Sequence, residues 1–171
     1  MINTMLDISE TEAGAANFDK MKVDIAPVLR DMAELFQPVA EDNAVSLLTE
    51  IPDHCYANVD MQSFQRMVAN LFDNAFKYTS SGGTVTVMVK NMEPFIRISI
   101  QDTGVGISGK DLPQIFQRLY RCDTTRSQPG FGLGLSLALA IARSHGGDIQ
   151  AESIPSKGST FIITLPSLNK S

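Results

Sequence analysis

Apolar residues recur every three or four positions in four segments of the chain, the spacing that places side chains on one face of a helix. This pattern predicts helices from the N-terminus to Gly14 and over residues 26–43, 61–79 and 133–145. Pro38 lacks a backbone N–H and is expected to kink the second helix or to end it early. The third helix is the clearest, because one face collects Phe64, Met67, Val68, Leu71 and Ala75.

Other segments alternate apolar and polar residues with period two, as half-buried strands do. Residues 84–91 and 95–102 are predicted to form a hairpin, and residues 148–166 to form two strands around a turn at "SKGS". Shorter strands are expected at residues 22–25, 44–51 and 55–60. Residues 104–131 have little periodicity and are expected to form a long loop or lid. Strands and helices do not alternate regularly, so the predicted class is α+β with a mixed sheet.

Length and composition narrow the classes of protein that the chain can belong to. The 171 residues suffice for one domain, and 43% hydrophobic and 19% charged residues are ordinary globular values. The net charge of −5 argues against a surface for nucleic acid or an anionic membrane. Two cysteines form no disulfide framework, and no apolar run has the length of a membrane span, so we expect a cytoplasmic domain.

Four polar residues lie within a narrow arc of the third predicted helix, at the border of its apolar face. They are Asn70, Asn74, Lys77 and Tyr78. An amide oxygen is a hard, neutral ligand suited to Mg²⁺, and a lysine can meet a phosphate as a point charge. Taken alone, the pattern fits a solvated helix face equally well.

A carboxylate stands where a predicted strand ends, in "DTGVGI", residues 102–107. Asp102 can accept a hydrogen bond from an exocyclic amine such as adenine N6, and Gly104 and Gly106 let the backbone lie close to a planar ligand. The alternative is an ordinary Asp-x-Gly turn.

Cations and glycines gather in the predicted lid. Arg118, Arg121 and Arg126 precede "GFGLG", residues 130–134, which opens the last helix. Guanidinium groups suit a terminal phosphate, and a glycine-flanked helix N-terminus presents free N–H groups to anions. The segment is neither a P-loop nor a dinucleotide fingerprint, and each part alone fits a surface helix and a flexible turn.

In combination, these motifs resemble the catalytic ATP-binding domain of sensor histidine kinases of two-component systems. "NLFDNAFKYT" is similar to their N box, "DTGVGI" to the first glycine box, "IFQRLYR" to the F box and "GFGLGLSLA" to the second glycine box. "GSTFIITLP" resembles their closing strand, and "MINTMLDISETEAG" resembles the end of the second dimerisation helix. The resemblance thus assigns residues 1–18 to that helix and a linker, and residues 19–171 to the catalytic domain.

The resemblance implies a Bergerat-type fold, a two-layer α/β sandwich whose sheet is covered on one face by helices, with ATP held between helix and lid. Asn74 would ligate Mg²⁺, with Asn70, Lys77 and Tyr78 beside the phosphates, and Arg118 and Arg121 would face the γ-phosphate. Asp102 would bind adenine, supported by Gly104, Gly106, Ile107 and Thr160. Backbone groups of the second glycine box would hold the phosphates; these residues are Gly130, Gly132, Leu133, Gly134 and Leu135.

The activity implied is transfer of the γ-phosphoryl group of ATP to a histidine of the dimerisation domain, for relay to an aspartate of a response regulator. Related ATPases carry a water-activating glutamate where this chain has Asn70, so slow hydrolysis is expected. The parent protein is expected to be a homodimer and the present chain a monomer. The motifs leave open whether the parent is anchored in the inner membrane.

Two positions depart from the family pattern. Phe131 stands where a small or hydroxylic residue is usual, which puts the lid geometry in doubt. Neither His54 nor His145 has the sequence context of a phosphoacceptor, so the acceptor is expected outside this chain. The alternative function is an ATP-gated interaction module without phosphotransfer.

Overall fold

The computed structural model describes residues 2–12, 14, 16–122 and 130–168. The helices of this part are α1 (Ile2–Glu12), α2 (Ile25–Asp42), α3 (Met61–Tyr78) and α4 (Gly134–Ser144), with a 3-10 turn η1 (Leu112–Gln114). The strands are β1 (Met21–Asp24), β2 (Ser46–Glu50), β3 (Tyr56–Val59), β4 (Thr84–Met92), β5 (Phe95–Asp102), β6 (Asp148–Ile154) and β7 (Gly158–Pro166).

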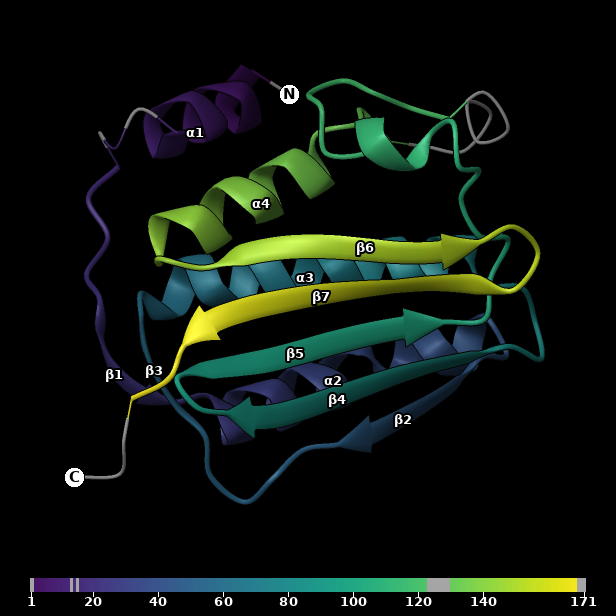
Figure 1. The fold of residues 1–171 in the computed structure, drawn as a ribbon. Helices are drawn as coiled ribbons and strands as arrows, with labels where there is room; N and C mark the ends of the chain where they lie inside the picture. The colour runs from purple at the N-terminus through teal and green to yellow at the C-terminus, as the bar shows by residue number, and fades with distance from the viewer. Residues whose placement is uncertain (1, 13, 15, 123–129, 169–171) are drawn as a thin grey trace.

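Five strands form one mixed sheet in the order β2-β4-β5-β7-β6, and β1 pairs with β3 in a separate two-stranded sheet. β2 runs parallel to β4, whereas the β4–β5, β5–β7 and β6–β7 pairs are antiparallel. Figure 1 shows α2, α3 and α4 together on one side of this sheet, with α1 beside α4. The predicted α+β class, a mixed sheet with helices on one face, is therefore confirmed.

The core lies between the sheet and the helices. Along β5, Ile96, Ile98 and Ile100 are fully buried and alternate with residues on the open face of the sheet. The five apolar residues predicted on one face of α3 are all buried as well. An aromatic stack joins the two larger helices, because the Phe36 ring of α2 lies 4.9 Å from Phe72 and 6.1 Å from Phe76 of α3. Burial of such rings is a major part of the hydrophobic free energy of folding.

The prediction for Pro38 is wrong in one respect, because α2 does not end there but continues to Asp42. Proline removes the N–H that would bond to the carbonyl of residue 34, one turn earlier. Glu34 and Pro38 both lie on the exposed side of the helix. Water can therefore hydrogen-bond the freed carbonyl, and the buried side of the helix holds the remaining turn in place.

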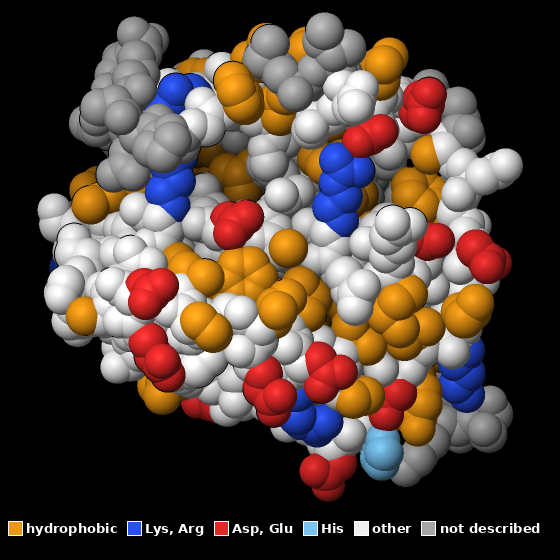
Figure 2. Space-filling view, turned by 180° about the vertical axis from the view of Figure 1, so that it is seen from behind, with side chains coloured by type: hydrophobic (Ala, Val, Ile, Leu, Met, Phe, Trp, Pro, Cys, Tyr) orange, Lys and Arg blue, Asp and Glu red, His pale blue; other side chains and the backbone are white. Residues whose placement is uncertain are grey.

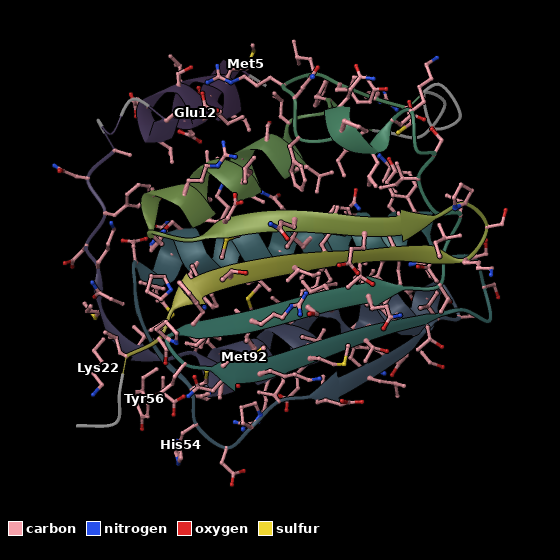
Figure 3. The ribbon with its side chains drawn as sticks, viewed as in Figure 1. Met5, Glu12, Lys22, His54, Tyr56 and Met92 are labelled. Carbon is pink, nitrogen blue, oxygen red and sulfur yellow. The ribbon has the colours of Figure 1, made fainter. Side chains whose placement is uncertain are left out.

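The two-stranded sheet closes one end of the molecule. The carboxylate of Asp24 accepts hydrogen bonds from the backbone N–H groups of Ala26, at the start of α2, and of Cys55. Its second oxygen lies 2.6 Å from Nδ1 of His54. The His54 ring stacks on Tyr56, and Nζ of Lys22 lies 5.1 Å from the centre of the Tyr56 ring, as the neighbouring labels in Figure 3 indicate.

The N-terminal helix packs against the rest of the fold through its inner face. Ile8 is fully buried, and Asp7 forms a 2.8 Å ion pair with Arg66 of α3. Glu12, at the other end of α1 from Met5 in Figure 3, bonds to Arg118 of the loop that follows η1. Among the described residues, we find no helix with the length and apolar character needed to cross a membrane.

Candidate functional site

A cavity of about 770 Å³ opens on the helical side of the molecule, between α3, the loop after β5 and the start of α4. In Figure 2, which views this side, the surface is hollowed at the upper left, beside atoms drawn in grey. The cavity brings together most of the predicted site residues from distant parts of the sequence. Those that line it are Asn70, Asn74, Lys77, Tyr78, Asp102, Gly106, Ile107, Arg121, Gly130, Gly132, Leu133, Gly134 and Leu135.

Asp102 provides a buried carboxylate at the end of β5, with only 3% of its surface exposed. Its Oδ1 accepts hydrogen bonds from the backbone N–H groups of Gly104, at 2.8 Å, and Ser159, at 3.3 Å. Burial raises the pKa of Asp102 above its ordinary value, and these two N–H groups lower it in part. A buried acceptor of this kind strongly favours a ligand that brings a hydrogen-bond donor.

The loop after Asp102 passes so close to its neighbours that side chains are excluded. A Cβ on Gly104 would lie 2.2 Å from the carbonyl oxygen of Tyr78, at the end of α3. Gly106 has a φ of +69°, and a Cβ there would lie 2.2 Å from the carbonyl oxygen of Ile154. Gly104 therefore fits the loop against α3 and does not itself line the cavity among the described residues.

The polar border of α3 faces the N-terminal end of α4 and the glycine segment before it. The amide Nδ2 of Asn70 is buried and has no hydrogen-bond partner among the described residues. Gly134, the first residue of α4, lies against this amide, since a Cβ on it would be 3.8 Å from Oδ1 of Asn70. Lys77 lies against the glycine segment as well, because a Cβ on Gly130 would be 3.0 Å from Nζ of Lys77. An unpaired buried amide is costly and indicates a place for a polar ligand.

The N-terminus of α4 is open toward the cavity. Leu133 occupies the N-cap position and cannot cap with its side chain, and the first turn carries no acidic residue. The initial N–H groups of a helix have no partner within the helix, and together with the helix dipole they attract anions. Gly132, with a φ of +70°, turns the chain directly before this point.

Titratable groups of both signs line the cavity: Arg66, Lys77, Arg121, Asp73, Asp102 and Asp111. Burial raises the pKa of Asp73, which precedes Asn74 on α3. Hydrogen bonds donated by the hydroxyl groups of Ser108 and Tyr120 lower the pKa of Asp111. The cations can offset part of the charge of a polyanionic ligand, and partial enclosure makes these interactions stronger than in water.

The two lid arginines, both expected at the γ-phosphate, lie in different environments. Arg121 lines the cavity. Arg118 instead turns to α1, where its guanidinium bonds to the Glu12 carboxylate and, at 3.1 Å, to the Ser9 hydroxyl. Arg126 lies outside the described residues.

Thr160, like Gly104 and Arg118, is a predicted site residue that does not line the cavity. Side chains alternate along β7, and Ser159, not Thr160, shares the face of the buried Phe161 and Ile163. Ser159 lines the cavity and bonds to Asp102, so the sequence reasoning selected the neighbouring position. The alternation along the strand held the missing signal, because Ser159 is in phase with the large apolar residues Phe161, Ile163 and Leu165.

Tyr120, Asp111 and Ser108 are further residues of the cavity that the sequence analysis did not select. The Tyr120 hydroxyl donates to Oδ1 of Asp111, and the Ser108 hydroxyl donates to Oδ2, both at 2.6 Å. The N–H of Leu119 bonds to the carbonyl of Gly132 at 2.9 Å, so the F-box segment is tied to both sides of the cavity. The contacts of Tyr120 and Leu119 have no signal in the sequence, because both depend on how the lid folds back.

Neither histidine of the chain, both of them described, lines the cavity. His145 is buried, and Nε2 of its ring accepts the N–H of Asp60 at 3.0 Å. Since the carbonyl of Ile141 lies 2.7 Å from Nδ1, that nitrogen must donate, and the ring is neutral. Burial lowers the pKa of His145, in agreement with this neutral form.

Phe131 and Cys122 complete the wall on the lid side. Phe131 leaves 65% of its surface exposed, so it stands at the mouth of the cavity and does not fill its interior. Cys55 lies elsewhere, in the core, where burial raises the pKa of its thiol to about 11.

Comparison with known proteins agrees with this geometry. Residues 59–169 match the family described as histidine kinase-, DNA gyrase B-, and HSP90-like ATPase. The chain is similar to the sensor histidine kinase WalK of Bacillus subtilis, with 33% identity over 97% of this chain and 28% of the relative. It is also similar to the sensor protein SrrB of Staphylococcus aureus, with 32% identity over 97% of this chain and 29% of the relative. The chain thus spans less than a third of the length of these relatives.

Solved structures show the same fold. Full-length ShkA in complex with AMPPNP superposes with a TM-score of 0.85 at 24% identity, over 99% of this chain and 36% of that protein. The mycobacterial sensor histidine kinase MprB gives a TM-score of 0.77 at 26% identity, over 88% of this chain and all of that chain. With its matched family region and its cavity between α3, lid and α4, the chain belongs to the histidine kinase-, DNA gyrase B-, and HSP90-like ATPases.

Proposed function

We propose that this domain binds Mg-ATP and transfers the γ-phosphoryl group to a histidine on the dimerisation domain of a sensor histidine kinase. The observation that carries the proposal is that one cavity joins the buried carboxylate of Asp102, the Asn70 amide nitrogen, which has no partner in the described part of the chain, and the start of α4, which lacks a side-chain cap. The first group suits a base with an exocyclic amine, and the other two suit phosphates and a cation.

Asp102 selects the base. Its carboxylate accepts a hydrogen bond from an amino group such as adenine N6, whereas the carbonyl of guanine at that position would be repelled. Ser159 takes the place beside Asp102 that we expected for Thr160, and Gly106 and Ile107 form the adjoining wall.

The polar border of α3 and the start of α4 hold the triphosphate. The backbone N–H groups from Gly132 to Leu135 bind phosphate oxygens, and Lys77 and Arg121 balance their charge. The described residues contain no cluster of three or more His, Cys, Asp or Glu side chains that could hold a metal by themselves. This donor set fits Mg²⁺ that takes most ligands from phosphates and water and one from the amide oxygen of Asn74, with Asn70 close by. When bound, the ion neutralises charge that develops on the transferred group.

The same residues favour transfer to a protein acceptor over hydrolysis. Asn70 stands where related ATPases place a glutamate that activates water, and an amide does not take up a proton at neutral pH. In the transfer, a nitrogen of the acceptor imidazole forms a bond to the γ-phosphorus, the bond from phosphorus to the bridging oxygen breaks, and ADP leaves. The domain supplies position and charge stabilisation for this step.

The proposed partners follow from this reaction. Helix α1 forms the end of the second dimerisation helix, and the residues up to 18 form the linker to the catalytic domain. The dimerisation domain provides the acceptor histidine within a homodimer. The phosphoryl group then passes to an aspartate in the receiver domain of a response regulator, and the domain works on the cytoplasmic side of the membrane.

The test is to mix this chain with a separately produced dimerisation domain and ATP labelled at the γ-phosphate. We expect phosphate on the dimerisation domain that is labile in acid and stable in base, as phosphohistidine is. Loss of the label with Asn74→Ala, but not with Asn58→Ala on the exposed side of β3, would assign the transfer to this site. Absence of labelling despite ATP binding would contradict the proposal.

One observation favours a second function, an ATP-gated interaction module without transfer. Arg118 is bound to α1 and not to the cavity, so nucleotide binding could change the contact between α1 and the lid. The labelling experiment separates the two functions, because a module of this kind binds ATP and changes shape but leaves the acceptor unmodified.

A further inference from the structure

Two serine hydroxyl groups, one at the cavity wall and one beyond it, lie next to each other near the carboxylate of Asp102. Ser153 of β6 and Ser159 of β7 are direct cross-strand partners, and their oxygens are 2.9 Å apart. Ser159 lines the cavity and donates its backbone N–H to Asp102, whereas Ser153 is not among the lining residues that are described.

Ser153 makes two further contacts that fix its hydroxyl group. It accepts the backbone N–H of Ile107 at 2.7 Å, and its oxygen lies 2.9 Å from the carbonyl oxygen of Gly158. One side chain therefore ties the loop after β5, which contributes Gly106 and Ile107 to the cavity, to the hairpin of β6 and β7.

The direction of the hydrogen bonds follows from counting protons. The carbonyl of Gly158 can only accept, and a serine hydroxyl has one proton, so Ser153 uses its proton on that carbonyl. With the Ser153 proton assigned to that carbonyl, we assign the proton between the two hydroxyl groups to Ser159, which donates it to Ser153. With that proton committed, the Ser159 oxygen has only lone pairs to present to the cavity.

We infer that Ser153 is a positioning residue that sets the base specificity of the cavity through Ser159 and Ile107, without touching the ligand. The inference rests on the proposed function, since it assumes that the ligand is a purine nucleotide. Asp102 and Ser159 together form an acceptor-only wall, which matches the two hydrogens of an exocyclic amine and repels a carbonyl. A Ser159 hydroxyl released from Ser153 could rotate and donate to the carbonyl of guanine, so selection would weaken.

The test compares Ser153→Ala, Ser153→Thr and the unchanged chain by calorimetric titration with ATP and with GTP in the presence of Mg²⁺. For Ser153→Ala we expect the ratio of the GTP and ATP dissociation constants to fall roughly three- to tenfold, the usual effect of one hydrogen bond. Ser153→Thr keeps the hydroxyl group, so its ratio of the GTP and ATP dissociation constants should stay close to that of the unchanged chain. Ser99→Ala, which removes the hydroxyl of a strand serine on the opposite face of the sheet, is the matched control and should leave the ratio unchanged.

The possible results separate the inference from the proposed function. If the unchanged chain does not bind ATP, the proposed function fails. If it binds ATP selectively and Ser153→Ala weakens both nucleotides equally, Ser153 has only a structural role and the inference is wrong. If Ser153→Ala does not fold, Ser153→Cys carries the same test, because a thiol is a weak donor and acceptor and should lower the ratio as well.

Discussion

The carboxylate of Glu12 in α1 holds the guanidinium of Arg118, a residue of the lid segment 106 positions further along the chain. This contact keeps Arg118 out of the cavity for which its sequence motif predicts it. Both side chains are partly exposed, with 35% of the Arg118 side chain and 51% of the Glu12 side chain accessible to water. Exposed ion pairs contribute little to stability, so a triphosphate with several negative charges can compete for the arginine.

We therefore expect Glu12→Gln to release Arg118 and to raise the affinity for ATP by about two- to fivefold, the range that an exposed ion pair allows. The affinity for ADP should not change, because Arg118 is expected to meet the γ-phosphate. Titrations at low salt measure both. Asp148→Asn, which breaks the exposed 3.3 Å pair with Arg143, is the control. An equal gain for ADP would show that the effect does not act through the γ-phosphate.

Asn70→Ala should separate stability from activity. The substitution removes an amide whose Nδ2 is buried without a partner among the described residues. We expect the free energy of unfolding to stay within about 1 kcal/mol of its original value or to rise, since Nδ2 has no described partner to lose and the cost of burying it disappears. Phosphotransfer to an added dimerisation domain should fall at least roughly tenfold. Urea unfolding together with the labelling assay tests this, and a clear loss of stability would mean that Asn70 is a structural residue.

His145 should make the domain less stable as the pH falls below neutrality. Burial holds the folded pKa of His145 below the value of about 6.5 found in unfolded chains. The unfolded state therefore takes up a proton first, and stability decreases as the pH falls from about 6.5 toward the folded pKa. Above this pH window, the neutral ring keeps its bonds to Asp60 and Ile141, and its full contribution to the free energy of unfolding is present.

The measurement is urea unfolding at several pH values between 7.5 and 5, for the original chain and for His145→Gln. A glutamine amide can accept and donate as the neutral ring does but does not titrate there. The variant should show a flatter dependence on pH, and an identical dependence would assign the effect to other groups.

The sequence predicted the elements well where one residue pattern determines them. The apolar face of α3 and the alternation of β4 and β5 are local signals, and the polar arc from Asn70 to Tyr78 follows from helix geometry once α3 is placed. These features brought most of the candidate site together correctly, although the roles of its residues stay predictions.

What could not be predicted depends on contacts between distant segments. Arg118 was expected at a phosphate because nothing in its motif reveals Glu12 of α1. The motif assigns Thr160 to the adenine pocket but does not state which face of the strand a residue occupies, and a shift of one residue reverses that face. Ser153 carries no motif at all, and its importance lies only in the three groups that it joins.

Calorimetric titration with ATP and GTP, on the chain and on Asp102→Asn, tests whether Asp102 selects an adenine nucleotide. Asparagine keeps the oxygen that accepts the N–H groups of Gly104 and Ser159, and it removes an ionised group whose pKa burial raises, so the variant should fold at least as stably. We predict that the original chain binds ATP in preference to GTP and that Asp102→Asn lowers the affinity for ATP at least roughly tenfold. The side-chain NH₂ group of the introduced asparagine can donate to the carbonyl of guanine, so the preference for ATP over GTP should also narrow or reverse. Equal binding of both nucleotides by the original chain, or unchanged ATP affinity in a folded Asp102→Asn variant, would contradict the account.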